Sequence, residues 1–153
     1  MAIDSILDKV IEKAGEVTVK VSDLTDDIWS DEEKLIIDEF KDSGVEKVKD
    51  ILSNLNNSGD LFDKSGFHLS VLNVALGIPP VISAGYIVKE KISSEERAKI
   101  LFEAESNKIV KILISCLFKA SDFYDKIQFG TYKLNSIEIK LGLIPGIALK
   151  FSN

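Results

Sequence analysis

Two apolar segments, each interrupted by a glycine–proline stretch, constrain this 153-residue chain more than any other feature. The first reads FHLSVLNVALGIPPVISAGYIV (67–88), and the second reads YKLNSIEIKLGLIPGIALKF (132–151). Alternation of apolar and polar residues is typical of a half-buried strand, and glycine and proline favour a turn. We therefore expect two similar β-hairpins, at about 67–88 and 132–151.

The two hairpins can be aligned with an offset of sixty-five residues, and five of the sixteen positions from 67 to 82 are then identical. Leu69 falls on Leu134, Pro80 on Pro145 and Ile82 on Ile147. Two interpretations stay open. The segments are either two strand pairs of similar design or the two copies of an internal repeat.

Residues 94–126 carry the strongest helical pattern of the chain. Ser93 and Glu96 form a capping box, and no glycine or proline follows for about thirty residues. Nearly every residue between Ile109 and Phe118 is apolar, which is typical of a helix that is buried on most sides. The sequence predicts one long central helix over about 94–126.

Two amphipathic helices are expected before the first hairpin. Residues 3–14 place apolar side chains at helical spacing, and Gly15 would end that helix. A second helix is expected over 31–55, started by a capping box of Ser30 and Glu33. Between the two helices, 17–21 alternates as a short strand would.

These elements predict a single α+β domain over 1–153. An antiparallel sheet made of the two hairpins, with strand 17–21 as a candidate further strand, would pack on the long helix. The two N-terminal helices would cover the remaining apolar surface. A chain of this length can bury about 70% of its unfolded surface, which is enough for a core without disulfides.

The formal net charge of −6 argues against nucleic acid as a partner, because nucleic acid is a polyanion. The only cysteine, Cys116, excludes an internal disulfide and favours a reducing compartment. The N-terminal residues lack the basic region of a signal peptide, so a cytoplasmic location is expected.

The stretch 67–88 has no formally charged residue and is long enough to cross a bilayer. Adjacent prolines at its centre, Pro79 and Pro80, would interrupt the helical hydrogen bonding that lipid demands. The sequence therefore favours a hairpin over a membrane-spanning helix.

No residue pattern nominates a catalytic, metal or cofactor site, so the expectation is a protein that is not an enzyme. His68 is the only histidine, and a Cys116–His68 dyad would need a proximity that the sequence does not indicate. The acidic loop around Asp23, Asp26 and Asp27 lacks the spacing of a calcium loop. Trp29, the only tryptophan, could be a helix staple or a binding hot spot.

We expect a non-enzymatic protein-interaction domain that binds a protein partner or a second copy of itself. The C-terminal strand could lie at a sheet edge, with Lys140 and Lys150 as its protecting charges. One alternative is a carrier of a lipid or another hydrophobic ligand, held between the strands and the long helix. Another is a membrane-interacting protein that inserts the uncharged 67–88 segment.

Overall fold

The structure is a computed structural model of the chain, and it describes residues 9–13, 16–21, 45–77, 80–124, 131–142 and 146–152. Its elements follow one another as β1 (Lys9–Lys13), β2 (Glu16–Val21), α2 (Val45–Asn57), α3 (Gly59–Lys64), β3 (Phe67–Ala75), β4 (Val81–Val88), α4 (Ser94–Glu103), η2 (Ala104–Ser106), α5 (Lys108–Tyr124), β5 (Lys133–Leu141) and β6 (Gly146–Ser152).

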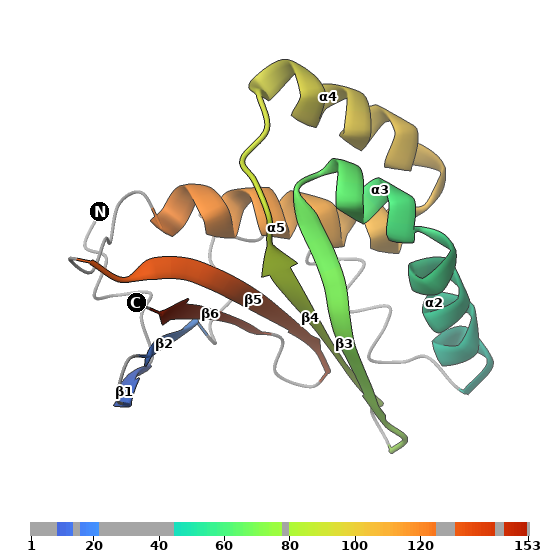
Figure 1. Cartoon of the computed structure of the whole chain (residues 1–153). Helices are drawn as coiled ribbons and strands as arrows, with labels where there is room; N and C mark the ends of the chain where they lie inside the picture. The colour runs from blue at the N-terminus through green and yellow to red at the C-terminus, as the bar shows by residue number, and fades with distance from the viewer. Residues whose placement is uncertain are drawn as a thin grey trace.

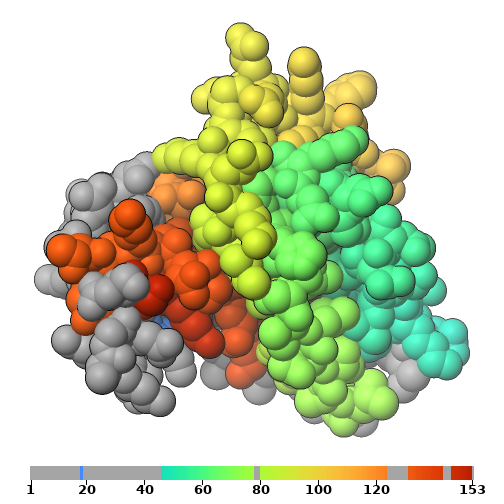
Figure 2. All heavy atoms as spheres, in the orientation of Figure 1, coloured from blue at the N-terminus to red at the C-terminus, as the bar shows by residue number. Residues whose placement is uncertain are grey.

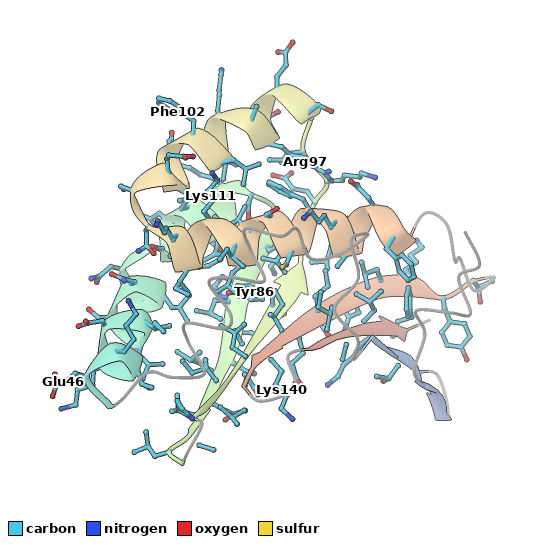
Figure 3. All side chains as sticks on the ribbon, turned by 180° about the vertical axis from the view of Figure 1, so that it is seen from behind. Glu46, Tyr86, Arg97, Phe102, Lys111 and Lys140 are labelled. Carbon is cyan, nitrogen blue, oxygen red and sulfur yellow. The ribbon has the colours of Figure 1, made fainter. Side chains whose placement is uncertain are left out.

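The strands form one antiparallel sheet in the order β1-β2-β6-β5-β4-β3. The helix α5 lies across one face of this sheet. The strands β3 and β4 pass in front of α5 in Figure 1, and α5 passes in front of them in the reverse view of Figure 3. We call the face toward α5 the core face and the opposite face the outer face. No described helix covers the outer face (Figure 1).

Both expected hairpins are confirmed as antiparallel strand pairs, β3 with β4 and β5 with β6. Their registers correspond under this offset: Leu69 pairs with Tyr86, and Leu134 pairs with Phe151. Both pairs also contain a register shift at the same relative place, after Leu69 in the first hairpin and after Leu134 in the second. These two leucines are separated by the offset that aligns the two sequences.

Alternate residues of the strands build the core with α5. Ile82, Ala84 and Tyr86 of β4 are buried, and the residues between them are only partly buried. The same alternation continues in β5 and β6, which bury Ile137, Ile139, Leu141, Ile147, Leu149 and Phe151. Every second side chain of each strand therefore points toward the core face. From α5, the buried side chains include Val110, Leu113, Ile114, Cys116 and Leu117.

The helix expected over 3–14 is wrong for residues 9–13, which form β1 and pair with β2. Lys13 pairs with Glu16, so only two residues connect the strands, a length typical of a tight hairpin. Val10 and Ile11 are β-branched and favour a strand, and pairing with β2 overrides the helical spacing. Residues 3–8 lie outside the described residues. Strand 17–21 is confirmed within β2.

The single helix expected over 94–126 is also wrong, because it divides into α4, the short η2 and α5. Asn107 has extended backbone angles, and its side-chain Oδ1 accepts a hydrogen bond from the Val110 backbone N–H. Asn107 therefore caps a new helix instead of continuing the first one. Ser93 is confirmed as the N-cap of α4, since its Oγ accepts from the Glu96 N–H and donates to Glu96 Oε1.

The second expected helix, 31–55, overlaps α2, which begins at Val45 and ends at Asn57. Residues 31–44 lie outside the described residues. The short helix α3 was not expected. It leads directly into β3, and Gly66, with a φ of 93°, makes the connection.

Candidate interaction surface

His68 and Cys116, the two residues considered for nucleophilic chemistry, lie on different sides of the sheet. His68 is half-exposed on the outer face, where it pairs with Ile87, and its Nδ1 lies 2.9 Å from Asp63 Oδ1. Cys116 is fully buried in α5, against the core face. The Cys116–His68 dyad does not form, and the described residues contain no group of three or more His, Cys, Asp or Glu that could hold a metal ion.

The acidic loop and Trp29, which the sequence also singles out, lie outside the described residues. Among the described helices, none is long and apolar enough to cross a membrane.

The only arginine of the chain, Arg97, joins α4 to α5. Its guanidinium lies 4.7 Å from the centre of the Phe118 ring, and Nη1 donates to Asp122 Oδ2 over 2.9 Å. Lys91 reaches the other oxygen of the same carboxylate at 3.5 Å. Asp122 therefore pairs with both cations, and this cluster fastens α4 and the segment before it to α5.

The C-terminal strand is not at an edge, which corrects the expectation from the sequence. β6 lies between β2 and β5, and the sheet formed by the described strands has β1 and β3 at its edges. Lys140 and Lys150 lie on the outer face, opposite Ser83 and Ser136 respectively, so they do not guard an edge. An interaction through a strand edge must therefore be sought at β1 or at β3.

The two edge strands differ in charge. β1 reads KVIEK, so three of its five residues are charged. β3 reads FHLSVLNVA and contains no Lys, Arg, Asp, Glu or Pro. Lysine and proline on an edge strand discourage pairing with another chain, and β3 lacks both.

The second half of β3 and the residue after it are exposed. We call residues 71–75 the β3 edge segment. Val71 is 51% exposed, Val74 is 37% exposed and Leu76, which follows the segment, is 69% exposed. Figure 2 shows this end of the β3–β4 hairpin at the lower rim of the molecule. Large apolar side chains are thus concentrated on one free strand end, whereas scattered single ones need no explanation.

A bulge separates the β3 edge segment from the rest of the strand. The register shifts between Leu69 and Val71, and Ser70 Oγ donates to the Gly85 carbonyl at 3.3 Å. Before the bulge, Phe67 is buried and α3 packs close to the strand. After it, Val71 to Ala75 pair without interruption with β4, and within the described part of the chain no strand pairs with them on the other side.

Phe102 is the most exposed large apolar side chain among the described residues, at 81%. It points away from the molecule at the end of α4 (Figure 3). Its neighbour Glu103 is exposed and charged, and Leu101 on its other side is partly buried. Phe102 is therefore a single exposed ring, whereas the β3 edge segment combines exposed apolar side chains with the edge of a strand.

Sequence reasoning missed this surface although one signal was present. In the sequence, the absence of charge over 67–88 indicates a membrane segment or a hairpin, and it also suits an unprotected strand edge. The edge expected from the sequence is instead the C-terminal strand, with Lys140 and Lys150 as its protecting charges. Comparison with protein-family models, with curated proteins and with solved structures found no match to this chain.

Proposed function

We propose that this chain is a protein-interaction domain that binds a partner by adding a strand to the free edge of β3. The observation that carries the proposal is the exposed, uncharged β3 edge segment at a sheet edge without lysine or proline. In strand addition, backbone hydrogen bonds supply affinity and alternate side chains supply specificity. Here Val71 would contact the partner on the outer face, and Leu72 and Val74 on the core face.

The second hairpin supports this proposal if the two hairpins are copies of one unit, as we also propose. They share a register, a bulge position and five of sixteen aligned residues. In the alignment β5 corresponds to β3, and β5 is paired with β4 along the edge that β3 leaves free. The unit would then be built to accept an antiparallel strand at that edge.

These observations give less support to the two alternative functions, membrane insertion and transport of a hydrophobic ligand. Insertion of the whole 67–88 segment into a membrane would remove Phe67, Ile82 and Tyr86 from the core, at a cost of about 1.5–3 kcal/mol for each large apolar side chain. A carrier of a hydrophobic ligand would need a cavity at the core face, where Tyr86, Leu113 and Leu117 are fully buried against their neighbours.

Photo-crosslinking in the native cell tests the proposal. A benzophenone amino acid would replace Val71 or Leu76 at the edge and, in a matched control, Lys140 on the outer face or Lys99 on α4. We expect adducts with a protein from the two edge positions and not from the controls. The added substitution Asn73→Lys should remove these adducts, because it places a charge on the edge.

Equal adducts from all four positions, or none from the edge positions, would overturn the proposal. Mass spectrometry of the adduct gives the peptide that lies against β3. A strand-addition partner should contribute a single extended segment, with reactive residues spaced by two.

A further inference from the structure

We propose that the strand that occupies the β3 edge is the β3 edge segment of a second copy of this chain, paired antiparallel about a twofold axis at Asn73. This inference rests on the proposed function and names its partner. It makes the two six-stranded sheets of the copies continuous across the dimer.

The length of the free segment fixes the register of such a pair. The bulge at Ser70 bounds the uninterrupted ladder at one end, and β3 ends at Ala75. Only one antiparallel self-pairing uses all five residues of 71–75, and it places Asn73 opposite Asn73 of the partner subunit. Any other twofold register leaves residues of the segment unpaired or enters the bulge.

The side chains on both faces suit this register. Residues that pair with Ala84 and Ile82 lie on the core face, so Leu72 and Val74 face the core side, while Val71, Asn73 and Ala75 face outward. In the pair, Leu72 of each copy meets Val74 of the other, and Val71 meets Ala75. Apolar residues therefore meet apolar residues on both faces, and the exposed Val74 becomes covered.

Asn73 is the only side chain of the segment with a polar group, and it lies on the axis. An amide both donates and accepts hydrogen bonds, so two asparagines related by a twofold axis can bond to each other. A single polar pair at an apolar contact is a known device for fixing register and oligomeric state. No charged residue lies in the segment to repel its own copy.

The contact is short, so the dimer should be weak and concentration-dependent. Sedimentation velocity of the purified chain over a range of concentrations measures it. We expect a reversible monomer–dimer equilibrium with a dissociation constant below about 0.5 mM. A chain that is monomeric up to that concentration overturns the inference but leaves the proposed function to the crosslinking result, where a partner of another sequence would still appear.

Charge variants test the position of the axis. Asn73→Lys and Asn73→Asp would each place like charges opposite one another and should raise the dimer dissociation constant at least about tenfold. A mixture of the two variants pairs opposite charges and should restore association. Dimers that persist in both single variants, or a mixture that stays monomeric, would show that Asn73 is not on the axis.

Cysteine variants test the register without relying on affinity. Asn73→Cys should form a disulfide between subunits under mild oxidation, because only a residue on the axis faces itself. Val71→Cys faces Ala75 of the partner subunit and should crosslink far less. The native Cys116 is fully buried and does not compete. Equal crosslinking of both variants would contradict the proposed register.

Discussion

The Arg97 guanidinium on α4 donates a hydrogen bond from Nη1 to Oδ2 of Asp122 on α5, over 2.9 Å. The two residues are far apart in sequence. Their contact holds α4 beside α5, although the helix is interrupted at Asn107. Figure 3 shows Arg97 on the side of α4 that faces α5. The side chain of Arg97 is only 17% exposed, while that of Asp122 is about half-exposed.

Replacing Arg97 by lysine should destabilise the protein by about 1 kcal/mol. Lysine keeps the charge but loses the planar group that stacks on Phe118 and bonds to Asp122. Urea unfolding followed by circular dichroism measures the change. Lys99→Ala, at an exposed position of the same helix, is the control and should change the free energy of unfolding by less than about 0.5 kcal/mol. Equal effects of the two substitutions would contradict a special role for Arg97.

Asp122 should make stability depend on pH in the acid range. Partial burial raises the pKa of this carboxyl, but the Arg97 hydrogen bond and the charges of Arg97 and Lys91 outweigh it and hold the pKa below its usual value. A carboxyl with a lowered folded-state pKa stabilises the fold above its unfolded pKa of about 4 and loses this contribution as the pH falls through the folded value.

Asp122→Asn should therefore be less stable than the parent protein at neutral pH, and the difference should shrink as the pH falls below about 4. Urea midpoints of both proteins at a series of pH values from neutral to acid give this difference. Glu103→Gln, at an exposed position, controls for the loss of one negative charge. A difference that grows toward acid pH would reverse the expected sign and exclude the ion pair as its cause.

Tyr86→Phe should leave the stability unchanged or raise it by about 1 kcal/mol. Tyr86 is fully buried, its ring centre lies 5.0 Å from that of Phe62, and its hydroxyl has no hydrogen-bond partner among the described residues. Burial, with a smaller contribution from Cys116, raises the pKa of Tyr86, so the hydroxyl stays protonated and neutral.

Thermal and urea unfolding of Tyr86→Phe and Tyr86→Ala separate the hydroxyl from the ring. The alanine variant loses the buried ring and should cost about 3–5 kcal/mol. A loss above about 1 kcal/mol in the phenylalanine variant would mean that the hydroxyl has a partner that stabilises the fold.

Gly66→Ala should destabilise the protein by at least about 2 kcal/mol. Gly66 has a φ of 93°, and an added Cβ would collide with the backbone carbonyl of Glu90. Its own carbonyl accepts from the Lys89 N–H at 2.8 Å, which ties the start of β3 to the residues after β4.

Gly59→Ala is the matched control, because an added Cβ at Gly59 meets no atom within 4 Å. Gly59 begins α3, where alanine should stabilise by about 0.5 kcal/mol. Chemical unfolding of the two variants should therefore give changes of opposite sign. A neutral Gly66→Ala would contradict the positive φ and the close approach of the Glu90 carbonyl at this turn.

The sequence predicted the two hairpins well because their signals are local. The alternation over 133–141 predicts a strand, and the proline beside a glycine that follows predicts a turn. Both signals lie within one short segment. The capping box at Ser93 is local in the same way, and its hydrogen bond forms as expected.

The errors concern segments whose structure depends on distant residues. Residues 9–13 have helical spacing, and only pairing with β2 shows that they form a strand. The break at Asn107 has a local signal, since asparagine is a common N-cap residue, but the lack of glycine and proline over 94–126 favours one continuous helix. The place of β6 could not be predicted, since no local pattern states which strand lies beside which.

The candidate surface was partly predictable for the same reason. The lack of charge in 71–75 is plain in the sequence, whereas its position at a sheet edge follows from the strand order alone. An uncharged strand in the middle of a sheet is ordinary, whereas the same strand at an edge presents backbone groups that can pair with another chain.

The central place of β6 has a consequence for synthesis on the ribosome. Glu16 of β2 pairs with Ser152, and Lys133 of β5 pairs with the same residue from the other side. The β1–β2 pair therefore cannot join the sheet until residues 146–152 have left the ribosome. Because contacts between such distant residues slow folding, completion of this sheet should be the late step, and the nascent chain must keep two strand edges from premature pairing until then.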